Sequence, residues 1–399
     1  MSYDMREFLT PKRVTNAMWD YSWLVGHYSG GPFEDFDKVT DELLERNFNT
    51  IRIDCFPWIA ANMKSLDEVV TFSASPLATW GVSDKEYKHC ILEELVELLK
   101  LAKEKGIYII LSNWWVSCKE YNQRPDSNGY ANAEKLLKKG WEIILKVISD
   151  NELLDIVLYV DFDQEFPFFS FAKGMLNDLC TNEREKVISV NGENAMENAG
   201  LRKNARDLKW NSAQMDFVSD YFSSFIAHFQ RLYPELRFTF SLTEYLHEVR
   251  ALKLSAFDVL ELHFWIHNPR FENRTGFTSM IKDRGEHDYR DYQARLDKTM
   301  HAVRPMLMKE MENRLVYAKE WGKEWAAPVI TTESWGPWWH MDHKDLKWEW
   351  LRDWCAECMC MAADHGLWGV TPWNYSHPYW KNWMDAKWYK KVNGAFLNS

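Results

Sequence analysis

The 399-residue chain lacks an excess of basic residues, because 48 Lys and Arg face 59 Asp and Glu and the formal net charge is −11. An acidic chain without a basic patch is a poor partner for nucleic acid or an anionic membrane. No apolar run reaches membrane-spanning length, and residues 1–7 lack the apolar segment of a signal peptide. We therefore expect no nucleic-acid partner, no membrane partner and a cytoplasmic location, although a secreted chain trimmed of its signal peptide would look the same.

Signals for a cofactor or a metal are also missing. No Gly-rich phosphate turn follows an early strand, which disfavours a doubly wound nucleotide-binding fold. The seven cysteines are scattered, apart from Cys355, Cys358 and Cys360 in one apolar-faced helical segment, and no second Cys or His pair stands at zinc-site spacing. We expect buried free thiols, a reducing compartment, no cofactor and no metal.

Tryptophan is the residue type in excess, with 22 copies. Its ring offers a flat π face and a polar N–H, and it is rarely fully buried. A chain this rich in tryptophan often has an aromatic-lined cleft, although many of these rings must belong to the core.

Strand-like and helix-like segments alternate along the whole chain. The predicted strands are residues 17–24, 49–54, 107–112, 154–160, 237–242, 259–264, 329–332 and 367–372. The predicted helices are residues 36–46, 90–105, 133–149, 212–232, 246–254, 289–321, 347–364 and 385–396. Short apolar strands without clean alternation are typical of a parallel sheet covered on both faces. Eight such units in one chain without linkers or repeats predict an α/β fold, a single (β/α)₈ TIM barrel over residues 1–399.

Three connections are long, residues 55–89, 166–210 and 265–288, and they follow the second, fourth and sixth strands. Loops that follow strands lie at the C-terminal face, where barrel active sites are built. We therefore expect these three loops to form the walls of the active site.

Two strand-like segments end in a glutamate. Residues 158–167 run from an apolar strand into Glu165, and residues 328–339 run into Glu333, which is followed by several aromatic residues. A pair of carboxylates is what a glycoside hydrolase needs to protonate the leaving group and attack the anomeric carbon. For either segment alone, a polar strand end that faces water is an equal alternative.

The remaining strand ends complete a consistent set of polar and aromatic residues: Arg52, Asn113, Gln164, His263, Trp335, Trp373 and Asn374. This pattern resembles the clan A glycoside hydrolases, and within them the cellulase-like proteins near glycoside hydrolase family 5. The resemblance implies a retaining enzyme that cleaves a β-linked saccharide, with Glu165 as acid/base and Glu333 as nucleophile. It also implies a substrate-binding role for Arg52, His263 and Trp373, while Gln164 stands where the family has an asparagine that holds the sugar 2-hydroxyl.

The chemistry assigns a protonation state to each glutamate. Aromatic neighbours such as Phe162 and Phe166 would raise the pKa of Glu165, as an acid requires. Arg52 would keep Glu333 ionised, unless it forms a purely structural ion pair with Asp54 or Asp20.

Other assignments remain open at this stage. His263 and Trp373 could be core residues, Asp163 could be the acid in place of Glu165, and Glu244 could bind a hydroxyl. Trp338 and Trp339 are weaker candidates for sugar stacking. The competing functions are a non-catalytic carbohydrate-binding barrel and a metal-dependent barrel hydrolase, whose ligands would be His263, His267, Asp54 and Glu244. The identity of the sugar and the oligomeric state are not predicted.

Overall fold

The computed structural model describes residues 9–74, 83, 85–180, 210–243, 247–252, 257–266, 271, 274–275, 289–337 and 340–399. Eight parallel strands form one sheet in the order β7-β6-β5-β2-β1-β10-β9-β8. They are β1 (Val14–Asp20), β2 (Thr50–Asp54), β5 (Tyr108–Ser112), β6 (Val157–Asp161), β7 (Phe238–Thr239), β8 (Leu260–Glu261), β9 (Val329–Thr331) and β10 (Gly369–Val370).

Hydrogen bonds between β7 and β8 close this sheet into a barrel. Leu242, just after β7, bridges to Leu262, just after β8. The backbone N–H of Leu242 donates to the carbonyl of Glu261 at 3.0 Å, and that of His263 donates to the carbonyl of Leu242 at 3.1 Å. The predicted (β/α)₈ barrel is therefore confirmed.

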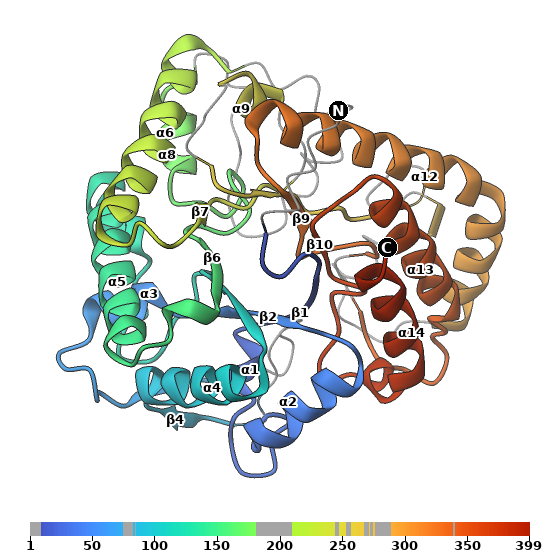
Figure 1. Cartoon of the computed structure of the whole chain (residues 1–399), viewed down its shortest axis with the longest axis horizontal. Helices are drawn as coiled ribbons and strands as arrows, with labels where there is room; N and C mark the ends of the chain where they lie inside the picture. The colour runs from blue at the N-terminus through green and yellow to red at the C-terminus, as the bar shows by residue number, and fades with distance from the viewer. Residues whose placement is uncertain are drawn as a thin grey trace.

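Helices surround the barrel in chain order, from α2 through α4, α5, α8 and α12 to α13 and α14 (Figure 1). The described helices are α1 (Ser22–Val25), α2 (Phe36–Glu45), α3 (Pro57–Asn62), α4 (Ile91–Lys105), α5 (Tyr130–Asp150), α6 (Lys173–Asp178), α8 (Ser212–Leu232), α9 (His247–Ala251), α12 (Tyr289–Trp325), α13 (Glu349–Asp364) and α14 (Ala386–Leu397). None of the described helices is both long enough and apolar enough to cross a membrane.

Local sequence explains where two of the surrounding helices begin and end. Helix α4 buries a leucine-rich face and ends at Gly106, whose φ of +69° is a left-handed conformation that glycine adopts without a steric penalty. Helix α8 begins with a capping box, in which Asn211 and Gln214 satisfy each other's backbone N–H groups. The predicted bounds of α8, residues 212–232, are confirmed.

The barrel interior is apolar at its N-terminal end. One buried cluster contains side chains from the first halves and middles of the strands and from residues just before them: Val14, Ile110, Leu158, Tyr159, Val259, Ile330 and Trp368. Charged and polar side chains replace apolar ones towards the C-terminal ends, where Arg52, Asp161 and Glu261 are fully buried. The interior is thus apolar at one end and polar where the candidate site lies.

The first strand differs from its predicted position. We predicted residues 17–24, but β1 spans Val14–Asp20 and residues 22–25 form the short helix α1. The apolar residues after Asp20 resemble a strand in sequence, yet they pack as a helical turn outside the sheet. The loop after β2 is also more ordered than predicted, because it contains α3 and a hairpin of β3 (Val70–Phe72) and β4 (Tyr87–His89).

The two other predicted long loops lie largely outside the described residues. The part of the loop after β6 that is described includes α6, and the loop after β8 is described at residues 265–266, 271 and 274–275. The candidates Glu244, His267, Trp338 and Trp339 also lie outside the described residues.

Candidate active site

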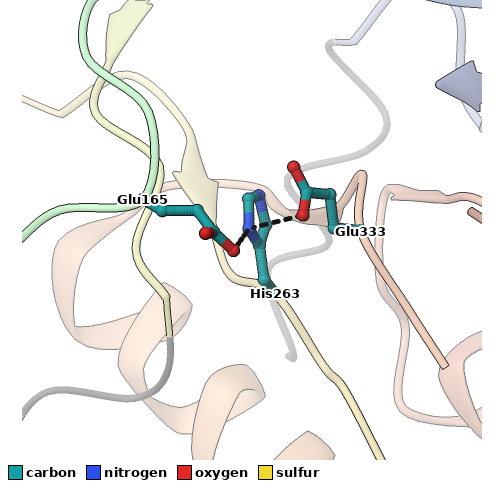
Figure 2. A group of neighbouring side chains, drawn as sticks. All are labelled: Glu165, His263 and Glu333. Carbon is teal, nitrogen blue, oxygen red and sulfur yellow. Dashed lines mark hydrogen bonds and ion pairs between the residues drawn. The ribbon is translucent and has the colours of Figure 1, made fainter. Parts of the chain in front are cut away.

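Glu165 and Glu333 meet at the C-terminal end of the barrel. Glu165 follows β6 by four residues and Glu333 follows β9 by two. One carboxylate oxygen of each, together with a ring nitrogen of His263, lies within 4.8 Å of the others. Figure 2 shows His263 between the two glutamates, which extend towards it from opposite sides. Two glutamates 168 positions apart in the chain therefore form one carboxylate pair.

A turn in the backbone presents Glu165 to the site. Its φ is +49°, in the left-handed region that residues other than glycine rarely adopt. Its backbone N–H donates to the hydroxyl of Ser241 at 3.0 Å, which fixes the turn against the end of β7. Strain held in place by neighbouring contacts is common at functional sites.

His263 links the two carboxylates through a single nitrogen. Its Nδ1 lies 2.8 Å from Oε1 of Glu165 and 3.5 Å from Oε2 of Glu333, and its Nε2 lies 3.5 Å from Oε1 of Glu261. Burial alone would lower the pKa of His263, but the charge of Glu333 and the hydrogen bonds to Glu165 and Glu261 raise it to about 10. The imidazole is therefore protonated at neutral pH and donates to its neighbours.

Arg52 lies below this pair, fully buried on β2. Its Nη1 donates to Oε1 of Glu333 at 2.9 Å and lies 3.4 Å from Asp20. The guanidinium also lies 3.6 Å from Asp161 and 3.7 Å from Glu261. Arg52 thus contacts Glu333 and also belongs to a buried ion-pair network that includes Asp20, so its ion pair with Asp20 is not a purely structural one.

Burial and the neighbouring charges have opposing effects on the pKa of Glu333. Burial raises the pKa of Glu333 to about 8, and the charge of Glu165 adds to that rise, while His263 and Arg52 oppose it. Only 1% of Glu333 is exposed. Arg52 contacts Glu333, and its positive charge opposes the larger effect of desolvation on the pKa of this carboxyl group.

Gln164 lies between Arg52 and Glu333. Its Oε1 accepts a short hydrogen bond from Nη2 of Arg52, and its Nε2 donates to Oε1 of Glu333 at 2.5 Å. Both halves of the amide therefore have partners inside the protein.

The two other predicted amides, Asn113 and Asn374, are each hydrogen-bonded through one of their two polar atoms. Asn113 donates through Nδ2 to the carbonyl of Phe162 at 3.2 Å, and Asn374 accepts through Oδ1 from the backbone N–H of Ser334 at 2.5 Å. Oδ1 of Asn113 and Nδ2 of Asn374 are buried without a hydrogen-bond partner among the described residues. Unpaired buried polar atoms at strand ends are suited to bind substrate hydroxyls.

The two predicted tryptophans are enclosed by the protein. Trp335 is fully buried, stacks on Phe264 with ring centroids 6.0 Å apart, and donates its N–H to the carbonyl of Thr371. Trp373 is 1% exposed, because His340 and Trp388 pack edge-on against it. The substrate-binding role that the resemblance implies for Trp373 therefore cannot be stacking on an open ring face, and the ring of Trp335 is equally enclosed. Trp373 differs in one respect, since its N–H has no partner within the described structure.

The geometry excludes Asp163 as the partner of Glu333 in the described structure. Its Oδ2 accepts hydrogen bonds from Ser170 at 2.5 Å and Tyr221 at 3.1 Å. Burial raises the pKa of Asp163 to about 6, while these two hydroxyls lower it. The side chain is thus bound within the loop after β6.

Sequence reasoning missed Asp161 and Glu261, the fully buried acids on β6 and β8 that contact Arg52. Burial and the neighbouring Glu261 raise the pKa of Asp161 well above its usual value. The sequence did contain a signal for both acids. Each stands two residues before a candidate, Asp163 or His263, and alternate residues of a strand point to the same side of the sheet.

Glu165, His263 and Glu333 could also act as ligands of a divalent cation, because each offers one donor atom within 4.8 Å of the others. Two carboxylates and an imidazole suit several divalent metals. The guanidinium of Arg52 opposes a cation here, since it places positive charge 2.9 Å from a carboxylate oxygen of Glu333. All seven cysteines are free thiols, as predicted, but their expected burial holds only for Cys55, Cys118, Cys355 and Cys358, because Cys360 is exposed and Cys90 and Cys180 are half-buried.

Comparisons with solved structures identify the fold. A protein from Parabacteroides distasonis, provisionally described as a glycoside hydrolase, is 23% identical with a TM-score of 0.73, over 96% of this chain and 93% of that one. A family 5 mannosidase from Rhizomucor miehei gives a TM-score of 0.51 at 10% identity, over 97% and 93% of the two chains. A hyperthermophilic endo-β-1,4-glucanase gives 0.51 at 12% identity, over 97% and 96%.

Sequence comparison identifies the family. A search of curated proteins found no match. The family model of sugar-binding cellulase-like proteins matches residues 16–396, which include every strand of the barrel except the start of β1 and all of the candidate site. The chain therefore belongs to the sugar-binding cellulase-like family and has the barrel fold of glycoside hydrolase family 5.

Proposed function

We propose that this protein is a retaining glycoside hydrolase that cleaves a β-linked oligosaccharide, polysaccharide or glycoside by double displacement. The observation that carries the proposal is the pair formed by Glu165 and Glu333, with one oxygen of each within 4.8 Å. Retaining enzymes hold their two carboxyl groups about 5–5.5 Å apart, whereas inverting enzymes leave about 6.5–9.5 Å for a water molecule. The short separation favours direct attack by a carboxylate.

Glu333 is the nucleophile in this proposal, because it is the carboxylate that Arg52 contacts at 2.9 Å. A positive charge at this distance favours the ionised form that attacks the anomeric carbon. Glu165 is the acid/base, which protonates the glycosidic oxygen as the bond breaks and later activates the water that hydrolyses the glycosyl-enzyme.

The pair needs one proton in total for the first step. Glu165 must carry that proton to protonate the glycosidic oxygen, and Glu333 must be ionised to attack the anomeric carbon. His263 faces both carboxyl groups with the same nitrogen, Nδ1.

The decisive experiment compares wild type with Glu333→Ala and Glu165→Ala on a screen of aryl β-glycosides and β-linked oligosaccharides. Glu333→Ala should abolish turnover, and azide should partly restore it with a glycosyl azide of inverted configuration as product. Glu165→Ala should still form the glycosyl-enzyme from substrates with activated aryl leaving groups, which need no acid. Identical behaviour of both variants across leaving groups would refute the assigned roles, and proton NMR of the first-formed anomer tests retention independently.

The metal-dependent alternative gains some support from the three donors that converge at the site. Dialysis of the wild-type enzyme against a chelator separates the two chemistries. Under the proposed mechanism the activity should persist after dialysis. Loss of activity with recovery on adding Zn²⁺ or Mn²⁺ would favour a metal-dependent hydrolase, and binding of saccharides without any turnover would favour a carbohydrate-binding barrel.

A further inference from the structure

Gln164 is bonded in a way that admits one orientation of its amide. A guanidinium can only donate hydrogen bonds and a carboxylate can only accept them. The oxygen of Gln164 must therefore face Arg52, and its nitrogen must face Glu333, as the hydrogen bonds show. This chemical constraint removes the usual ambiguity in assigning the two ends of a side-chain amide.

The two oxygens of Glu333 consequently differ. Oε1 accepts from Nη1 of Arg52 at 2.9 Å and from Nε2 of Gln164 at 2.5 Å. Oε2 lies 3.5 Å from Nδ1 of His263, beyond good hydrogen-bonding distance. An oxygen with two short donors is held in place and is a weaker nucleophile, so Oε2 is the oxygen free to form the new bond.

The three predicted sugar-binding amides differ in whether all of their polar atoms already have hydrogen-bond partners. Asn113 and Asn374 each retain a buried polar atom without a partner in the described part of the chain. Gln164 is 1% exposed, and both of its polar atoms are engaged. Releasing Gln164 to hold a sugar hydroxyl would leave buried groups of Arg52 and Glu333 without one partner each, which is costly.

We propose that Gln164 is a positioning residue that, together with Arg52, holds Oε1 of Glu333 so that Oε2 attacks the anomeric carbon, and that it does not read the sugar 2-hydroxyl. This inference rests on the proposed function and refines it. Two consecutive residues then have different roles, since Glu165 is the acid/base and the preceding Gln164 orients the nucleophile.

A substrate comparison distinguishes positioning from recognition of the 2-hydroxyl. Wild type and Gln164→Leu are assayed on the aryl β-glycoside that wild type turns over fastest and on its 2-deoxy counterpart. Loss of a nucleophile-positioning bond should lower kcat/KM by about tenfold or more, and by the same factor on both substrates. A much smaller factor on the 2-deoxy substrate would show that Gln164 binds the 2-hydroxyl and would overturn the proposal.

The pH profile provides a second readout that a merely structural role would leave unchanged. Glu333 is surrounded by His263, Glu165, Arg52, Asp20 and Tyr375. Gln164→Leu removes this donor and keeps the other groups. The midpoint of the ascending limb of the kcat/KM profile should then move up by about one to two pH units, the size expected for one hydrogen bond to a charged group. Gln164→Glu, which places an acceptor against Glu333, should raise it at least as far.

Gln214→Leu is the matched control, because Gln214 is another buried glutamine but bonds to Leu176 and Asn211 at the start of α8. Gln214→Leu should lower the melting temperature and leave the midpoint of the ascending limb of the kcat/KM profile unchanged. An unshifted limb in folded Gln164→Leu would refute the positioning role. If wild type hydrolyses no glycoside at all, the proposed function itself fails, which is a distinguishable result.

Discussion

Trp335 and Trp373 are both buried, yet their indole N–H groups differ, and this difference predicts different roles. The N–H of Trp335 donates to the carbonyl of Thr371 at 3.0 Å, between the segments that follow β9 and β10. The N–H of Trp373 has no acceptor among the described residues. A buried donor without a partner carries a desolvation cost that a bound hydroxyl would relieve.

Replacing each tryptophan by phenylalanine removes the N–H and keeps an aromatic ring. Trp335→Phe should destabilise the fold by about 1 kcal/mol more than Trp373→Phe, because the buried Thr371 carbonyl then keeps only the 3.4 Å hydrogen bond from the Ser334 hydroxyl. Trp373→Phe should instead lower kcat/KM. The measurements are a denaturation curve and a kinetic assay on both variants, and a larger kinetic loss for Trp335→Phe would reverse the assignment.

The packing of α3 against α5 depends on a glycine. Gly140 lies within α5, where a Cβ atom would stand 1.9 Å from the carbonyl oxygen of Pro57, the first residue of α3. Glycine inside a helix normally costs about 0.5–1 kcal/mol relative to alanine, so its presence here indicates a steric requirement. The sequence uses it to bring the two helices into close contact.

Gly140→Ala should therefore destabilise the protein, although the same change in most helices is stabilising. The backbone of α3 must move to admit the methyl group, and overpacking of this kind costs about 1–3 kcal/mol. Gly174→Ala in α6 is the control, since no atom lies within 4 Å of the added Cβ, and it should be neutral or slightly stabilising. Equal melting temperatures for the two variants would contradict the close-packing argument.

The order and type of the elements follow from the sequence because each depends on local periodicity. The ends of the first strand do not, since Trp23, Leu24 and Val25 are equally apolar in a strand and in α1. The interior partners of Arg52 are harder still to predict. Asp161 and Glu261 lie 100 positions apart, and only the closure and register of the barrel place both beside one guanidinium.

The candidate site was likewise only partly predictable from the sequence. The identities of Glu165, Glu333 and their neighbours were predictable because strand ends converge at one face of a barrel. The pKa of Glu333 was not predictable, because it depends on how completely this side chain is buried. Its 1% exposure is a property of the assembled fold. The contact between Arg52 and Glu333 was foreseen, but the effect of this charge on the pKa of Glu333 could not be weighed against desolvation from sequence alone.

At the scale of the whole molecule, several buried groups hold protons more tightly in the folded state than in the unfolded chain, and Glu333 and His263 are two of them. The pKa of Glu333 rises from 4.5 to about 8 through burial, and that of His263 rises from 6.5 to about 10 because carboxylates outweigh burial. Stability falls with rising pH wherever the folded state binds more protons. The contribution of Glu333 is present below pH 4.5 and is lost by about pH 8, and that of His263 is present below pH 6.5 and is lost by about pH 10.

We therefore expect the free energy of unfolding to decrease as the pH rises from about 5 to 9, measured by denaturant titration at each pH. Glu333→Gln keeps a side chain of similar shape that does not titrate, so its curve should be flatter than that of wild type between pH 5 and 8. Glu312→Gln is the control on the surface of α12, because Lys309 lowers the pKa of Glu312 and keeps it ionised across this range. Its curve should run parallel to wild type. If Glu333→Gln also runs parallel, Glu333 is already ionised in the folded protein, and Arg52 with His263 then outweighs the desolvation of the nucleophile.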